Sequence, residues 1–175
     1  MDLRDIKEFA KDTLSYILTA GVVIIVIVYV ATLQQVVGPS MDSTLKNQDI
    51  VILSKSHYKI FDMKRFDIIA FNYADTKYLI KRVIGLPGDK VEYKDNVLYI
   101  NGKVVEEEFL NGHTTKDFDT LSLGYETIPE GKYLVLGDNR ENSLDSRTIG
   151  LIDEEDVLGK VSIKIWPFYE FKIIN

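Results

Sequence analysis

Two residues of this sequence have the types needed for hydrolysis by an activated hydroxyl, Ser40 in GPSMDSTL and Lys81 in YLIKRVIG. A serine hydroxyl is a weak nucleophile until a nearby base accepts its proton, and a neutral lysine amine can be that base. Period-2 alternation in a strand sets Lys81 on the same face as Leu79 and Val83, where burial lowers a lysine pKa. Arg82 faces the other way and stays cationic, so Lys81 is the candidate base.

A third segment, GDNRENSLDSRTIG at residues 137–150, is dense in hydrogen-bonding side chains and directly follows the apolar run YLVL. Such groups beside a core strand are unfavourable unless they bond one another. The segment therefore predicts a polar turn network. Its members are Asp138, Asn139, Arg140, Ser143, Asp145, Ser146 and Arg147.

Other chemistries are poorly supported. The two histidines, His57 and His113, lie in polar surroundings outside any GxSxG or HExxH pattern, which predicts surface residues and neither a Ser-His-Asp triad nor a zinc site. Cysteine is absent, which removes thiol nucleophiles, disulfides and cysteine-bound zinc. GLPGDK lacks the spacing of a phosphate loop, and residues 138–150 fail the EF-hand pattern. The net charge of −6 argues against a nucleic-acid partner.

The elements that position Ser40 and Lys81 begin with an apolar segment. Residues 14–33 carry no charge, and about 20 apolar residues span a bilayer, so we expect one transmembrane α-helix. The run is longer than the apolar region of a cleaved signal peptide and lacks its small-x-small end, which favours a retained anchor. Arg4, Lys7 and Lys11 precede it and only Lys46 follows closely. This asymmetry predicts a cytoplasmic N-terminus at 1–12, an anchor at 13–34 and an extracytoplasmic body at 35–175.

The body reads as all-β, with short apolar or alternating runs separated by turn residues. We expect an antiparallel β-sheet, with a small inserted lobe around residues 106–124. The aromatic residues between Trp166 and Phe171 suit either core packing or docking at a membrane interface. Strands are predicted at residues 50–54, 67–73, 78–84, 90–93, 97–100, 132–136 and 160–166.

The motifs GPSMDSTL, YLIKRVIGLPGD and GDNRENSLDSRTIG, in this order behind one anchor, resemble the bacterial type I signal peptidases, the serine-lysine leader peptidases, in their single-span Gram-positive form. The resemblance covers the chain from Val36 to its end. It implies a membrane-anchored serine endopeptidase that removes signal peptides from secreted precursor proteins at the membrane. Ser40 would be the acylating nucleophile, and Lys81 the general base that later activates the deacylating water. No metal or organic cofactor is implied.

The resemblance also implies supporting roles. Ser143 would hydrogen-bond and orient the lysine, and Asp145 and Arg147 would form an ion pair. Asp138 and Asn139 would shape the same turn. Met41 would line the pocket for the small residue before the scissile bond, the bond that is cut. Some relatives add a hydroxyl to the oxyanion hole where this chain has Gly38, so backbone donors such as the Ser40 N–H must suffice.

Two positions depart from the family's motifs. Ser43 stands where a proline is usual, which loosens a turn beside the nucleophile, and Phe66 stands where a glycine is usual, although glycine alone reaches positive φ freely.

Two other functions remain as rivals. A self-cleaving serine-lysine repressor would need a DNA-binding N-terminus, which residues 14–33 contradict. A non-catalytic, membrane-tethered binding module would be expected to lose the serine or the lysine, and this chain keeps both.

Overall fold

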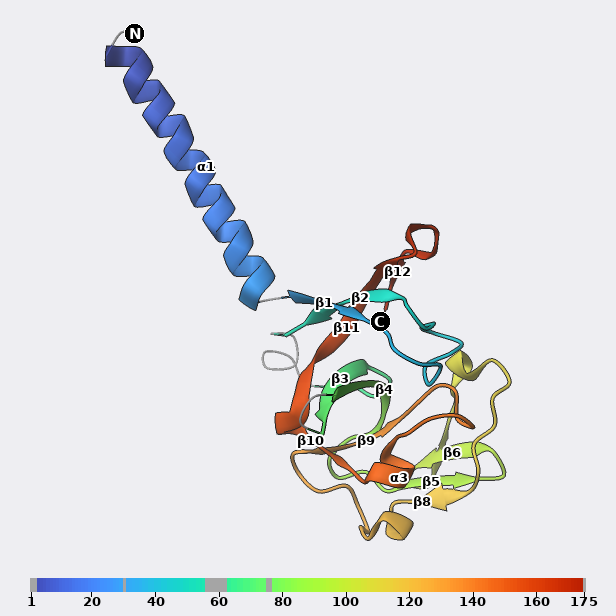
Figure 1. The fold of residues 1–175 in the computed structure, drawn as a ribbon. Helices are drawn as coiled ribbons and strands as arrows, with labels where there is room; N and C mark the ends of the chain where they lie inside the picture. Colours follow the sequence, from blue (N-terminus) through green and yellow to red (C-terminus); the bar gives the residue numbers. More distant parts are fainter. Residues whose placement is uncertain (1–2, 30, 56–62, 75–76, 175) are drawn as a thin grey trace.

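The computed structural model describes residues 3–29, 31–55, 63–74 and 77–174. An N-terminal helix, α1 (Leu3–Tyr29), leads into a body built on two β-sheets (Figure 1). The strands are β1 (Ala31–Gln35), β2 (Ile50–Ser54), β3 (Ile68–Tyr73), β4 (Lys77–Gly85), β5 (Val91–Lys94), β6 (Val97–Ile100), β7 (Lys103–Val105), β8 (Phe118–Asp119), β9 (Lys132–Leu136), β10 (Ile152–Asp153), β11 (Val157–Trp166) and β12 (Lys172–Ile173). The short helices are η1 (Glu108–Leu110), η2 (Leu121–Leu123), α3 (Ser146–Ile149), η3 (Glu154–Asp156) and η4 (Phe168–Glu170).

The larger sheet has the order β1-β2-β11-β3-β4-β9-β10, with β12 paired to β11. Every recorded strand pair is antiparallel, so the predicted antiparallel β body is confirmed. The strands predicted at 50–54, 97–100 and 132–136 have the observed bounds, and the other four differ by one to three residues at an end. Alternation on β4 sets Ile80 toward one apolar cluster and Val83 toward another, so the sheet is buried on both faces there.

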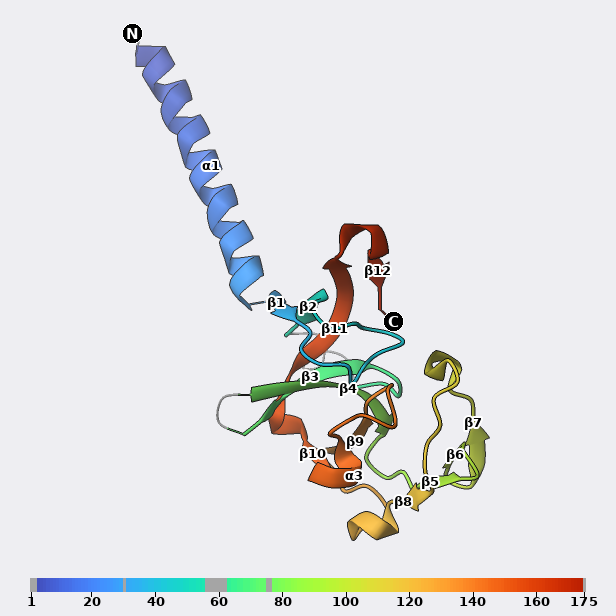
Figure 2. The same cartoon turned by 45° about the vertical axis from the view of Figure 1, so that its right-hand side comes forward.

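The smaller sheet has the order β7-β6-β5-β8 and forms a lobe beside the larger one (Figure 2). It begins at Val91, well before the lobe predicted at 106–124, because the predicted meander pairs with β8 instead of joining the large sheet. Asp95, Asn96 and Asn101 all have positive φ, which is the geometry of tight hairpin turns. Tyr93 and Leu98 of the lobe share an apolar cluster with Ile84 of β4 and Leu134 of β9, so the lobe packs against the larger sheet.

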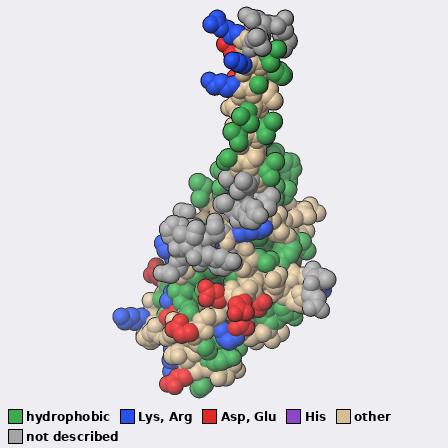
Figure 3. Space-filling view, turned by 90° about the vertical axis from the view of Figure 1, so that its left-hand side faces the viewer, with side chains coloured by type: hydrophobic (Ala, Val, Ile, Leu, Met, Phe, Trp, Pro, Cys, Tyr) green, Lys and Arg blue, Asp and Glu red, His purple; other side chains and the backbone are tan. Residues whose placement is uncertain are grey.

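Helix α1 projects from the body and exposes apolar side chains such as Ile17 and Val22 (Figure 3). Within the described ranges, no helix is long and apolar enough to cross a membrane. The C-terminal bound predicted for the anchor at 13–34 differs from the structure, because residues 31–35 are strand β1. Their backbone pairs with β2 from Ala31 opposite Ser54 to Gln35 opposite Ile50. The apolar composition that suggested a helix there belongs to an edge strand.

The C-terminal aromatic residues are not core residues, which corrects that alternative. Phe168 and Tyr169 are 75% and 86% exposed, and Trp166 packs edge-on against Phe168 with ring centroids 4.9 Å apart. The buried Lys164 amine holds this end of the chain through ion pairs with Asp49 at 2.8 Å and with Glu170 at 2.6 Å.

Candidate active site

The structure brings Ser40 and Lys81 together from separate parts of the chain. Lys81 lies in the middle of β4 with 1% of its surface exposed, and its Nζ lies 2.7 Å from the Ser40 Oγ. The same Nζ donates to the Ile80 carbonyl at 2.8 Å. Ser40 lies in the turn after β1, and its own carbonyl accepts the Asn139 N–H at 3.1 Å. The turn that carries Ser40, called the nucleophile turn below, is thus bonded to both β4 and the loop after β9.

Burial lowers the pKa of Lys81 from 10.5 to about 8, while the charges of Asp145 and Asp138 partly oppose that shift. An amine with this pKa is neutral in about one molecule in ten at pH 7 and in about half at pH 8, whereas an exposed lysine is almost fully charged. A neutral amine 2.7 Å from a hydroxyl can accept its proton. The pair can therefore generate an alkoxide nucleophile.

A backbone donor is available beside the nucleophile. In the described part of the chain no acceptor is recorded for the Ser40 N–H, whereas the Gly38 N–H is occupied by the Asn47 side chain at 2.9 Å. A free N–H next to the attacking oxygen can stabilise the oxyanion of a tetrahedral intermediate. Gly137 lies against the same turn, where a Cβ would overlap the Ser40 carbonyl oxygen and the Ser143 hydroxyl.

The predicted ion pair between Asp145 and Arg147 is present, with an Arg147 nitrogen 2.7 Å from the buried carboxylate. Asp145 also accepts the Gly137 N–H at 3.1 Å. Burial acts to raise the pKa of Asp145, but the hydrogen bonds and charge of Arg147 outweigh it, so the pKa lies below its usual value. The pair holds the polar loop, residues 137–150, against the end of β9.

Asp138 forms a buried ion pair that the sequence reasoning missed. Its carboxylate accepts two hydrogen bonds from Arg82, at 2.8 and 2.6 Å, and one from the Thr44 hydroxyl at 2.5 Å. Asp138 therefore links its own turn to β4 through Arg82 and to the nucleophile turn through Thr44. A signal was available: alternation on β4 buries Arg82 opposite Lys81, and a buried guanidinium requires an acidic partner.

Two roles that the family resemblance implies, for Ser143 and for Met41, are not matched by the contacts in the structure. The Ser143 hydroxyl oxygen is shielded from solvent and makes no hydrogen bond of normal geometry among the described residues, although it lies close enough to Asp145 to contribute to the lowered pKa of that carboxyl. The contacts of the Lys81 amine are instead with the Ser40 hydroxyl and the Ile80 carbonyl. Met41 is 1% exposed and packs with Val36 and Leu45 in an apolar cluster, so its side chain lies in the core and not on an open pocket wall.

The two motif departures meet at one residue of the lobe, Phe109 in η1. Ser43 has a φ of 99° and donates from its hydroxyl to the Phe109 carbonyl at 3.0 Å. Phe66 has a φ of 73°, the conformation for which glycine is preferred, and its ring meets the Phe109 ring at 5.1 Å. The Arg82 guanidinium lies 3.8 Å from the centre of the Phe109 ring. The unusual residues therefore dock the lobe beside the site.

A second lobe contact involves Arg140, which is 2% exposed. Its guanidinium donates to the Gly137 carbonyl at 3.0 Å, to Thr115 at 2.7 Å and to Glu107 at 2.5 Å. It also donates to the hydroxyl of Tyr93 in β5 at 2.9 Å. This network joins the small sheet to the loop that carries Ser143 and Asp145.

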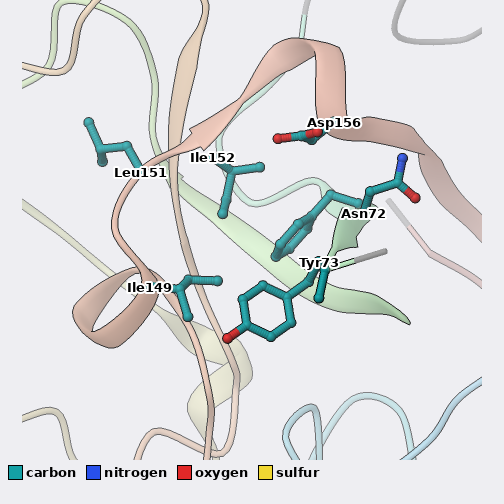
Figure 4. Close-up of a pocket in the computed structure, with 8 residues that line it drawn as sticks. Asn72, Tyr73, Ile149, Leu151, Ile152 and Asp156 are labelled. Atoms are coloured by element: carbon teal, nitrogen blue, oxygen red, sulfur yellow. The ribbon is translucent and has the colours of Figure 1, made fainter. Parts of the chain in front are cut away.

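A pocket of about 550 Å³ lies away from this site, between the end of β3 and the segment after α3 (Figure 4). Its lining includes Tyr73, Ile149 and Ile152, with Asp156 at one side. His57 lies outside the described residues, and His113 is half-buried. Among the residues that the structure describes, no cluster of histidine and carboxylate side chains could hold a metal ion.

This fold and site define a β-sheet hydrolase with a serine hydroxyl next to a buried lysine amine. The sequence profile of the family described as "Signal peptidase, peptidase S26" matches residues 6–166, so the chain belongs to that family and is a serine endopeptidase.

Similar proteins carry the corresponding names. Signal peptidase IB of Staphylococcus aureus is 40% identical over 179 aligned positions, which cover 93% of this chain and 94% of that protein. Signal peptidase I of Bacillus caldolyticus is 41% identical over 143 positions, covering 77% and 79%. The crystal structure of a signal peptidase I from Enterococcus faecalis V583 matches with a TM-score of 0.55 and 40% identity, over 58% of this chain and 98% of that one.

The conformation of Ser43 predicts that restoring the family's proline is harmful here. A proline ring fixes φ near −65°, far from the observed 99°, and the hydrogen bond to Phe109 depends on this turn. We expect Ser43→Pro to lower the free energy of unfolding by roughly 1–3 kcal/mol in urea titrations. Ser43→Gly accepts positive φ and loses only the hydroxyl hydrogen bond to Phe109, so it should cost less than Ser43→Pro, about 1 kcal/mol or below. Equal stability of the proline variant and the parent would contradict this turn geometry.

The lowered pKa of Lys81 predicts that burying this amine lowers the stability of the fold. The folded state releases this proton near pH 8 and the unfolded state near 10.5, so the unfolded state binds more protons between these values and stability rises with pH there. Below pH 8 the cost is on the order of 3 kcal/mol. We expect Lys81→Met to be at least as stable as the parent at pH 7, with an advantage that shrinks toward pH 9.5. Denaturant titrations at both pH values check this, and an advantage independent of pH would be the contrary result.

Proposed function

We propose that this peptidase removes signal peptides from secreted precursor proteins, with Ser40 as nucleophile and Lys81 as general base. The observation that carries the proposal is the 2.7 Å contact between the two side chains in a chain of the signal peptidase family. The alternative, a non-catalytic binding module, is disfavoured because both reactive groups are present and in contact.

The free edge of β4 supports an extended peptide substrate. β3 pairs with β4 along Lys77 to Arg82, but on the other side the recorded pairing with β9 begins only at Arg82. In the described part of the chain, residues 77–81 therefore have one open edge that ends at the catalytic lysine. A precursor segment can add to this edge as a further strand, with the residues before the scissile bond along β4.

The segment that carries the nucleophile follows the same part of β4. The Tyr78 hydroxyl donates to the Gln35 carbonyl at 2.7 Å, and three residues further on Lys81 contacts Ser40. A peptide held along the open edge is thus presented to Ser40. The family resemblance implies shallow apolar pockets here, which fit small residues at the first and third positions before the scissile bond.

The reaction follows from these positions. The neutral Lys81 amine accepts the Ser40 proton as the oxygen attacks the scissile carbonyl carbon, and the Ser40 N–H supports the resulting oxyanion. The Lys81 ammonium then gives its proton to the leaving amine as the C–N bond breaks, leaving an ester on Ser40. Water, deprotonated by the regenerated neutral amine, hydrolyses this ester and releases the signal peptide.

The proposal includes a membrane location for the enzyme. Residues 14–29 of α1 contain no charged side chain, and Arg4, Lys7 and Lys11 precede them. We place this helix in the membrane with the N-terminus in the cytoplasm and the body on the extracytoplasmic face, where signal peptide cleavage sites emerge. The exposed apolar side chains along the helix are consistent with a lipid environment.

The dyad predicts the phenotype of two substitutions. Detergent-solubilised protein should cleave a secretory precursor bearing an Ala-x-Ala site, and Ser40→Ala and Lys81→Met should each lower kcat by at least about 10³-fold. Ser122→Ala, a lobe hydroxyl that serves only its own turn, is the matched control and should retain activity. Gel analysis of precursor and product measures the rates, with circular dichroism to verify folding. Full activity of the lysine variant would remove Lys81 as base.

The lowered lysine pKa predicts the pH profile. Only neutral Lys81 accepts the serine proton, so kcat/KM should rise about tenfold per pH unit below 8 and level off above it. A peptide cleavage assay from pH 6 to 9.5, with circular dichroism at each pH, measures this profile. A flat profile over this range would rule out a titrating lysine base.

A further inference from the structure

The strand topology limits where the precursor can go after the scissile bond. A peptide on the open edge of residues 77–81 lies on the same side of β4 as β9, which occupies that side from Arg82 onward. The end of β9 at Leu136, paired with Arg82, therefore blocks the peptide from continuing in the sheet. The chain beyond the scissile bond must leave the sheet at this point. This step depends on the proposed function.

The exit lies beside Gly137, the residue that follows Leu136. A Cβ at Gly137 would overlap both the Ser40 carbonyl oxygen and the Ser143 hydroxyl, so these two serines flank the end of β9 from the nucleophile turn and from the polar loop. The apolar cluster around Met41 fills the interior on the side of the nucleophile turn. We therefore expect the chain to leave on the side of the polar loop.

A cavity of about 590 Å³ lies between the lobe and the polar loop, and its lining includes Ser143, whose side chain adjoins Gly137. Thr114 and residues 116–118 of the lobe form one wall, and Ser143, Arg147 and Thr148 are among the residues of the other. Both ribbon views place β8 of the lobe next to α3, which carries Arg147 (Figures 1 and 2). The volume lies within the roughly 300–1,000 Å³ typical of ligand sites.

Most residues that line this cavity have charged or hydroxyl side chains, and they include the carboxylates of Asp117 and Glu141 as well as the ring of Phe118. Two of the cavity's cations are already paired, Arg147 with Asp145 at 2.7 Å and Arg140 with Glu107 at 2.5 Å. Lys116 is exposed on the lobe wall and has no ion pair with any residue in the described part of the chain. Its charge is thus available to a bound peptide.

We propose that this cavity between the lobe and the polar loop binds the first few residues of the mature protein, on the leaving side of the scissile bond, and that Lys116 senses their charge. The ligand class is an extended polar peptide segment, in contrast to the apolar signal peptide on the other side of the cut. The lobe thereby makes the rate of cleavage depend on the charge of the first mature residues, which the dyad alone does not contact.

A charge-reversal experiment tests the role of Lys116. Two precursors that differ only in Glu or Lys at the third mature position are cleaved by the parent, by Lys116→Glu and by the control Lys103→Glu, an exposed lobe lysine on β7 outside the cavity lining. Lys116→Glu should shift the ratio of kcat/KM values toward the lysine precursor by about 3-fold at low salt, and the control should leave the ratio unchanged. An unchanged ratio in Lys116→Glu, or an equal shift in the control, overturns the inference while cleavage itself upholds the peptidase. If the parent cleaves neither precursor, the proposed function fails as well.

Photo-crosslinking locates the segment without depending on turnover. Full-length Ser40→Ala protein is irradiated with a precursor that carries benzoylphenylalanine at the third mature position, and the labelled peptide is identified by mass spectrometry. We expect labels within 114–118 or at Arg147 and Thr148, and none there when the probe lies six residues before the cut. Labels from the mature-side probe that fall elsewhere contradict the assignment.

Discussion

Removal of the Lys81 amine from water is the constraint on which the rest of the structure depends. An amine that is 1% exposed cannot keep the full hydration of an ammonium ion, and its pKa falls to about 8. The surrounding elements maintain this state: β3 pairs with β4 along Lys81, β9 pairs from the next residue onward, and the turn that carries Ser40 covers the amine. This buried amine destabilises the fold at neutral pH.

Three buried charge pairs give the site its geometry without supplying the base. Asp138 with Arg82 links the nucleophile turn to β4, Asp145 with Arg147 fixes the polar loop, and Arg140 with Glu107 attaches the lobe. Each pair joins segments distant in sequence except Asp145 with Arg147, which are two residues apart. Removing one partner of such a pair leaves an uncompensated buried charge. We therefore expect the loss of either side chain to disturb the arrangement of the turn, the loop and the lobe.

The dyad and the antiparallel body could be predicted from the sequence because they rest on local patterns: alternation on β4, and polar density after β9. β1 was missed because its apolar residues continue the composition of α1, and only pairing with β2 distinguishes a strand there. The missing contact between Ser143 and Lys81, and the meeting of Ser43 and Phe66 at Phe109, depend on how the lobe docks. No pattern of residue spacing in the sequence predicts how the lobe packs beside the site.

The most direct test of the account is the pKa of Lys81 itself. Protein labelled with ¹³C at lysine Cε, in detergent, would be titrated from pH 6 to 11 by NMR, with the Lys81 resonance assigned by its loss in Lys81→Met. The account predicts a midpoint near pH 8 for this resonance. A Lys81 midpoint above 10 would mean that fewer than about one amine in a thousand is neutral at pH 7, and would contradict its role as the base.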